Sequence, residues 1–243
     1  MRLGFTELRR SPGRFAAVAG AIGFIVFLAL ILAALSDGLY LGSTGAYRSS
    51  SADHFVFSSG SGFELEGSTV TSEDAAAVSA IPGVSEVGRL SSLNTTATAD
   101  GEDVQLSLVG ADEATMPATL TDGRRPEPGA LEVVVDRQAE RGGLTIGSVI
   151  EVSDGPDLEV VGVAEDAGFG FTTAWADHDL FDEVRAAVRP ELAALAGTSQ
   201  ALGVSLSDES AIAAIESETG LEGATPDQAI NALPAAAQQK TTL

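Results

Sequence analysis

The sequence predicts an α+β protein held in a membrane by one N-terminal transmembrane helix, with an extracytoplasmic domain that includes a small β subdomain. The first observation is a run of 21 residues from Phe15 to Leu35, FAAVAGAIGFIVFLALILAAL, without a charged side chain. The second is a series of short alternating segments after it, separated by turns rich in Gly, Pro and Asp. The third is that these strands mix with short helical patterns without a βαβ rhythm, which favours the α+β class.

The composition excludes several functional classes. The 243 residues include 13 Lys or Arg against 35 Asp or Glu, and the formal net charge is −22. Such an acidic chain lacks the basic face that nucleic acid requires. The absence of cysteine excludes a disulfide scaffold and thiolate metal sites. The only lysine is Lys240, and no glycine-rich loop precedes it, so we expect no ATP site and no cofactor in this chain.

The apolar run has the length of a membrane span. A helix of 21 residues is about 30 Å long, which matches the hydrocarbon thickness of a bilayer. Four arginines and one glutamate precede the run, whereas nine basic and 33 acidic residues follow Asp37. Basic residues stay cytoplasmic, so we expect residues 1–14 inside and those after about 36 outside. A cleaved signal peptide is the alternative, but its apolar region is usually shorter and no A-x-A site follows here.

The exported part begins with small and polar residues at 36–52, which we interpret as a connector. Residues 53–58, DHFVFS, predict a short strand. Thr71 and Asp74 fit a capping box that opens a short helix. Two longer strands then follow, at 84–98 and 103–110 around an Asp100–Gly101 turn.

The middle of the chain is rich in valine. Three short strands separated by turn residues predict a compact β subdomain: 131–136, 148–152 and 158–165. A short helical piece follows the first of them. Further on, the apolar spacing predicts a helix over 179–188 and a strand over 201–207. Two more helices are expected, one ended by Gly220 and one capped by Thr225 with Gln228 at its third position.

An aromatic cluster is the candidate contact with a partner. Phe169, Phe171 and Trp175 lie within AGFGFTTAW, and Gly168 and Gly170 flank the phenylalanines. One interpretation is a mobile hydrophobic loop that touches a partner or lipid. The other is a plug that closes the core of the β subdomain. The chain has a single tryptophan, so fluorescence can distinguish the two.

We expect no catalytic or metal site. The two histidines, His54 and His178, are far apart in sequence, and GTSQA around Ser199 only approaches the GxSxG pattern. Neighbouring carboxylates do not follow a calcium-loop pattern and are interpreted as solvated surface residues. These pairs are Glu165–Asp166, Asp182–Glu183 and Asp208–Glu209.

The order of these parts resembles a known family. The stretch at 123–166 contains GRRP, EVVV, GLTIG and VVGV in that order, and IPGV at 81–84 and TPDQAINALP at 225–234 add two more features. Together they resemble the first half of an ABC transporter permease of the macrolide-exporter and FtsX type. Ser148 departs from the family, which usually has Asp after the glycine equivalent to Gly147.

The resemblance implies a permease subunit without a catalytic site, whose ATP is hydrolysed by a separate cytoplasmic ATPase. It implies a membrane-proximal subdomain at 53–118 plus 200–235, with a distal subdomain inserted at 119–195. It also implies that 236–243 leads into a second span, with three spans after the domain. The chain stops at Leu243, so we expect a fragment of a longer permease, a split permease, or an anchored module that has lost transport.

The leading functional hypothesis is therefore a component of an ABC complex that couples ATP-driven motion to an external domain, for export or mechanotransmission. Its expected partners are an ABC ATPase, a second copy or the remaining permease spans, and the lipid bilayer. The alternative is a membrane-anchored binding module that presents the 168–175 segment to a partner. No nucleic-acid partner is expected.

Overall fold

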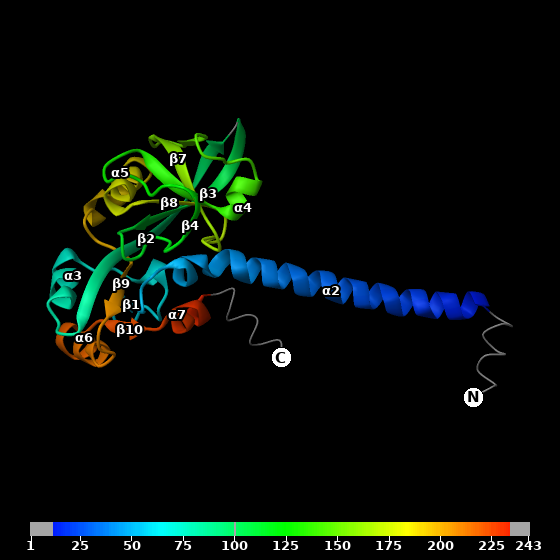
Figure 1. Ribbon diagram of the computed structural model, residues 1–243, viewed down its shortest axis with the longest axis horizontal. Coiled ribbons are helices and arrows are strands. Elements are labelled where there is room, and N and C mark those ends of the chain that lie inside the picture. Colours follow the sequence, from blue (N-terminus) through cyan, green and yellow to red (C-terminus); the bar gives the residue numbers. More distant parts are fainter. Residues whose placement is uncertain (1–11, 100, 234–243) are drawn as a thin grey trace. The chain divides into compact units, whose positions relative to one another are not determined.

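The structure is a computed structural model that describes residues 12–99 and 101–233 (Figure 1). The chain divides into two compact units, Met1–Tyr40 and Leu41–Leu243. Two predicted segments fall largely or wholly outside the described residues: the basic segment at 1–14 and the lead into a second span at 236–243.

The first unit contains most of helix α2, which spans Pro12–Ser49. Its window Ala16–Leu35 has a mean hydropathy of 2.8 and is exposed along its whole length, so it is long and apolar enough to cross a membrane. This window differs by one residue from the predicted limits Phe15 and Leu35.

The helix does not end at Leu35. Residues 36–49, predicted as part of a connector, continue the helix to Ser49. Small residues such as Gly and Ser are weak helix formers, which is why the sequence suggested a loop. The last turns are instead held by tertiary packing, because Thr44, Ala46 and Tyr47 are buried in the folded unit.

One part of the folded unit is an open antiparallel sheet. Its strands follow the order β10 (Glu222–Ala224), β1 (His54–Phe57), β9 (Ala201–Leu206) and β2 (Val84–Ala99). Helices α3 (Ser72–Ser79) and α6 (Ala211–Thr219) supply its core together with the sheet. The buried residues of this core include Val56, Val78, Ile81, Leu202, Val204 and Ile215.

The other part is a closed ring of six strands. It runs from β2 to β3 (Glu102–Ala111), β8 (Thr172–Asp177), β5 (Glu132–Asp136), β7 (Asp157–Ala164) and β6 (Val149–Val152), which pairs with β2 again. Strands β3 and β8, and β5 and β7, are parallel. Strand β4 (Leu120–Gly123) lies beside β7. The interior is filled by aliphatic side chains, among them Leu106, Leu108, Val133, Ile150 and Leu158. This small barrel contains the three strands predicted for the β subdomain together with β2, β3 and β8.

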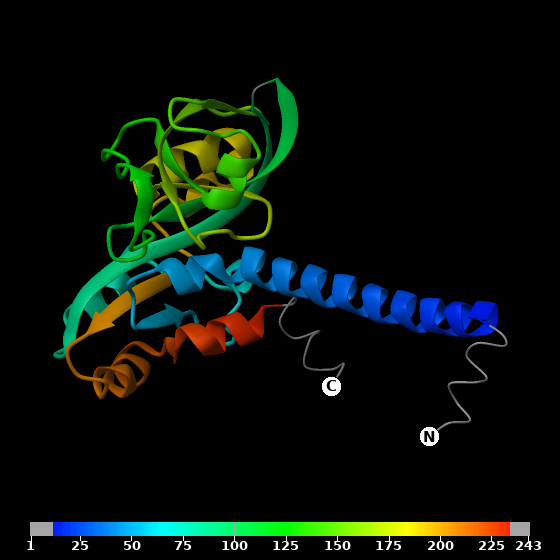
Figure 2. The same cartoon turned by 45° about the vertical axis from the view of Figure 1, so that its right-hand side comes forward.

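Strand β2 belongs to both parts. Its first half pairs with β9 and its last three residues pair with β6, while β3 pairs along residues 90–99. Figures 1 and 2 show β2 as one long curved strand that runs from the sheet beside α3 and α6 into the barrel. The barrel core therefore includes Ala97 and Leu106, which the predicted division at 118 and 119 assigns to the membrane-proximal part.

The remaining helices begin and end where the sequence indicated. Thr71 and Asp74 form the predicted capping box of α3, and Thr225 and Gln228 form that of α7 (Pro226–Ala232). Gly220 ends α6 in the left-handed conformation, with a φ of 72°. Helices α4 (Arg137–Arg141) and α5 (His178–Val188) contribute Ala139, Leu180, Phe181 and Val184 to the barrel core.

Candidate functional site

The candidate site is the contact between the last turns of α2 and the segment 165–171, within the folded unit. The amide of Gly45 donates a hydrogen bond to the carbonyl oxygen of Gly168 at 2.9 Å. A Cβ atom at position 45 would overlap the carbonyl oxygen of Gly168 and would lie 2.5 Å from its nitrogen and 2.6 Å from the carbonyl oxygen of Asp166. Only glycine allows the two backbones to approach this closely.

Tyr47 fixes the same turn of α2 through its ring. The ring is 1% exposed and packs edge-on against Phe55 of β1, with centroids 4.9 Å apart, and against Phe169 at 6.2 Å. Its hydroxyl has no hydrogen-bond partner among the described residues. Burial raises the pKa of this hydroxyl far above its ordinary value, so Tyr47 is neutral and contributes to the contact through its aromatic ring.

The segment 165–171 is in turn bonded to the start of β8. The amide of Phe169 donates to Oγ1 of Thr173 at 2.8 Å, and that hydroxyl donates to the carbonyl oxygen of Phe171 at 2.9 Å. Asp166 and Gly170 bend the backbone with positive φ values of 54° and 96°. The segment is therefore a tight structure fixed at one end by Gly45 and at the other by β8.

Trp175 is a buried residue of a barrel strand, β8, so the interpretation of an exposed contact loop is wrong for this residue. It is 0% exposed and its Nε1 donates to the carbonyl oxygen of Ala167 at 2.9 Å. The glycines in AGFGFTTAW are typical of a loop. Residues 172–177 nevertheless form β8, because they pair with β3 on one side and β5 on the other. Such long-range pairing has no local sequence signal.

The two phenylalanines of the predicted cluster differ from Trp175. Phe169 is half-buried beside Tyr47, and Phe171 is 55% exposed. The three rings therefore do not form one exposed surface. Contact of Phe171 with a partner stays a prediction.

His178 and Ser199, which we did not expect to be catalytic, are both buried. His178 is fully buried at the start of α5, and its Nε2 lies 3.0 Å from Oγ of Ser91. Burial, with the nearby positive charge of Arg89, lowers the pKa of His178 to about 4, so the ring is neutral at pH 7. Ser199 is buried and pairs through its backbone with Val70. None of these side chains faces solvent in the way that a nucleophile requires.

Two acidic residues, Asp112 and Asp182, accept hydrogen bonds from other parts of the fold. Asp112 accepts two hydrogen bonds from the guanidinium of Arg89, both at 2.8 Å, and they join β2 to the end of β3. Asp182 accepts from Arg185 at 2.7 Å and from the amide of Gly197 at 2.8 Å. Within residues 12–99 and 101–233 there is no group of three or more His, Asp or Glu side chains placed to hold a metal ion.

Sequence reasoning missed the two residues at the centre of the contact, Gly45 and Tyr47. Both lie in STGAY, which has the composition of a flexible connector. The signal that could have found them is a glycine two positions before a tyrosine, shortly before the first strand. That pattern is too common to identify a packed contact by itself.

Comparisons with known proteins identify the family. The model of the MacB-like periplasmic core domain matches residues 15–220. The crystal structure of the periplasmic region of MacB from Actinobacillus actinomycetemcomitans is similar in fold, with a TM-score of 0.55 and 14% identity over 80% of this chain and 95% of that one. The extracellular domain of the noncanonic ABC-type transporter YknZ from Gram-positive bacteria matches with a TM-score of 0.49 and 17% identity, over 72% of this chain and 99% of that one.

A comparison with curated proteins found no significant match. The family match covers the apolar helix, the whole barrel and the open sheet except β10, and it agrees with the motif order in the sequence. The chain therefore belongs to the MacB-like periplasmic core domain family, the core domain of MacB/FtsX-type ABC permeases.

Proposed function

We propose that this protein is a permease subunit, or the N-terminal half of one, in an ABC transporter, and that α2 carries ATPase-driven motion to the extracytoplasmic domain. The observation that carries the proposal is the course of α2. The helix continues without a break from the apolar span to Ser49, and its last turns are buried and hydrogen-bonded within the folded unit.

A helix transmits displacement well because each turn is hydrogen-bonded to the next. The contact at Gly45 leaves no free space, since even a methyl group would overlap the backbone of residues 166 and 168. A shift of the helix end must therefore move segment 165–171 or break the hydrogen bond to Gly168. That segment is bonded to β8, and β8 pairs with two strands of the barrel.

The charge distribution supports an orientation with the N-terminus in the cytoplasm. Arginines precede the apolar window, and the acidic domain follows it. In this arrangement an ABC ATPase lies on the cytoplasmic side, and a second copy or further permease spans complete the membrane part. The family description, a periplasmic core domain, supports a location of the domain outside the cell membrane.

The exposed ring of Phe171 favours a second candidate, an anchored binding module without transport activity. The two candidates differ in their partners. A permease forms a stable complex with an ATPase, whereas a binding module does not need one.

The test begins with the full chain carrying an affinity tag in its native membrane. After cross-linking and solubilisation, mass spectrometry of the captured material should identify an ABC ATPase, and the complex should hydrolyse ATP. Absence of any ATPase, with the buried emission of Trp175 showing an intact domain, would overturn the permease proposal in favour of the binding module.

Two matched variants test the role of α2. Gly45→Ala fills the tight contact, whereas Gly23→Ala makes the same change in the apolar window, where no atom lies within 4 Å. We expect Gly45→Ala to retain the ATPase but to change transport or ATP hydrolysis several-fold, with Gly23→Ala close to the parent. Equal activity of both variants would contradict transmission through the Gly45 contact.

A further inference from the structure

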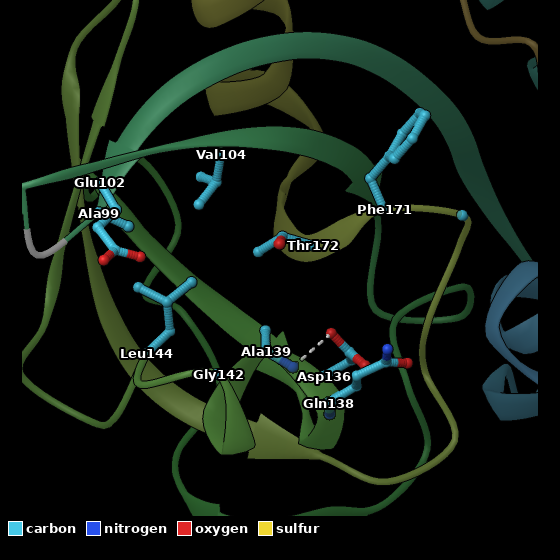
Figure 3. A pocket seen from close by; sticks show the side chains of 11 residues that line it. Ala99, Glu102, Val104, Asp136, Gln138, Ala139, Gly142, Leu144, Phe171 and Thr172 are labelled. Carbon is cyan, nitrogen blue, oxygen red and sulfur yellow. Dashed lines mark hydrogen bonds between the residues drawn. The ribbon is translucent and has the colours of Figure 1, made fainter. Parts of the chain in front are cut away.

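A cavity of about 570 Å³ opens at one end of the barrel (Figure 3). Its walls come from the β2–β3 hairpin, from α4 with the residues that follow it, and from the beginning of β8. Its volume is within the range of small-molecule sites, and the mouths of barrels are common places for them. The cavity takes no part in the contact between α2 and segment 165–171, except that Gly170 and Phe171 belong to its wall.

Much of the wall is apolar. Ala139 and Leu144 are buried residues of the barrel core, Val104 is half-buried, and Phe171 exposes 55% of its surface. A ligand that covers these side chains would remove apolar surface from water, which favours binding. The exposed phenyl ring in particular gives an aromatic face for an apolar or cationic group.

The charged residues of the wall are all acidic. Glu102 and Asp136 line the cavity, and none of its lining residues is Arg, Lys or His. Figure 3 shows the two carboxylates on opposite sides of the view, with Ala139 and Thr172 between them. Glu102 has no ion-pair partner within the described part of the chain, so its charge is available to a ligand.

Asp136 has a fixed position. Its carboxylate accepts hydrogen bonds from the amides of Gln138 at 3.0 Å and Ala139 at 3.3 Å, where it caps α4. Burial raises its pKa, which means that the charged form lacks solvation. A cation in the cavity would restore part of that solvation, whereas an anion would be repelled by both carboxylates.

We propose that this cavity binds a small organic cation with an apolar body, such as an aromatic amine. The apolar wall would hold the body, and Glu102 and Asp136 would balance the positive charge. The proposal goes beyond the permease function and does not depend on it, because a binding measurement on the isolated chain requires no ATPase.

The test uses the full chain in nanodiscs of zwitterionic lipid and three probes of similar size. These are 2-phenylethylammonium, neutral 2-phenylethanol and anionic 3-phenylpropanoate. Methyl NMR should show saturable shifts at Ala139, Leu144 and Val104 with the ammonium probe. We expect binding of the alcohol to be about tenfold weaker and no saturable shift with the carboxylate. Equal binding of all three probes would overturn the proposed ligand class.

Charge-removing variants test the site itself. The double variant Glu102→Gln with Asp136→Asn removes both charges, and asparagine still caps a helix. It should weaken the ammonium probe about tenfold or more, whereas Glu151→Gln on β6, outside the cavity, should leave binding unchanged. Unchanged binding by the double variant would refute the proposal.

If the double variant does not fold, two single variants can still test the site. Glu102→Gln changes an exposed residue and should weaken the probe by itself. Val104→Phe fills the cavity from a half-buried position and should block the ammonium probe and the alcohol. Undiminished binding of the ammonium probe by both variants would overturn the assignment.

Discussion

The substitution Gly45→Ala tests the contact between α2 and segment 165–171 most directly. The added methyl carbon would lie 2.6 Å from the carbonyl oxygen of Asp166, whereas ordinary contact begins at 3.4 Å. The carbonyl oxygen of Gly168 would lie closer still, so the two backbones must separate by about 1 Å, and comparable overpacking costs about 1–3 kcal/mol. That movement also weakens the 2.9 Å hydrogen bond from Gly45 to Gly168, which contributes about 1 kcal/mol.

One effect opposes this loss. Alanine favours a helix over glycine by up to about 1 kcal/mol, and position 45 is helical. The expected net loss is therefore about 2 kcal/mol. For a folded unit of this size, such a loss lowers the melting temperature by roughly 4–8 °C.

The assay is thermal unfolding of the detergent-solubilised chain, followed by the fluorescence of Trp175. This tryptophan is bonded to Ala167, next to the displaced residues, so its emission also reports local opening. Gly23→Ala is the matched control, because it gives the same helix propensity without a close neighbour. If Gly45→Ala melts with Gly23→Ala and the emission of Trp175 is unchanged, the close contact does not exist in solution.

Three other predictions address the buried polar and aromatic groups. Tyr47→Phe removes a buried hydroxyl without a partner among the described residues, so chemical denaturation should show unchanged stability or a gain of about 1 kcal/mol. The pKa of His178 is lowered from its ordinary value of about 6.5 to about 4, so the folded state favours the neutral ring. The resulting contribution to the free energy of unfolding is fully present above pH 6.5. That contribution, about 3 kcal/mol, should be lost as the pH falls from 6.5 to 4, and a steep slope that persists in His178→Gln would refute its origin. Phe171→Ser should change stability by no more than about 0.5 kcal/mol, whereas Trp175→Ser should cost about 4 kcal/mol, and similar losses in urea unfolding would contradict the observed burial.

Local elements of the fold were predictable because their signals lie within a few residues. The capping boxes at Thr71 and Thr225 depend on side chains three residues apart, and the stop at Gly220 depends on one residue. The hairpin between β2 and β3 is likewise a local structure. The apolar helix requires only continuous hydrophobicity.

The candidate site was less predictable than the fold. The sequence left two interpretations of Trp175 open, an exposed loop and a core plug. The exposed loop is wrong for this residue, because β8 forms by pairing with β3 and β5. Gly45 gave no specific signal. Its importance comes from the backbone of residues 166 and 168, more than 120 positions further along the chain.

The sequence by itself determined the apolar helix, the α+β class, the family and the limits of most helices and strands, because periodicity, charge and capping are properties of neighbouring residues. Only the tertiary structure decided that β6 returns to β2 and closes the barrel, that α2 continues to a buried end at Ser49, and that Asp136 and Glu102 share one cavity. These features depend on contacts between distant residues, whose energy arises only after the chain has folded.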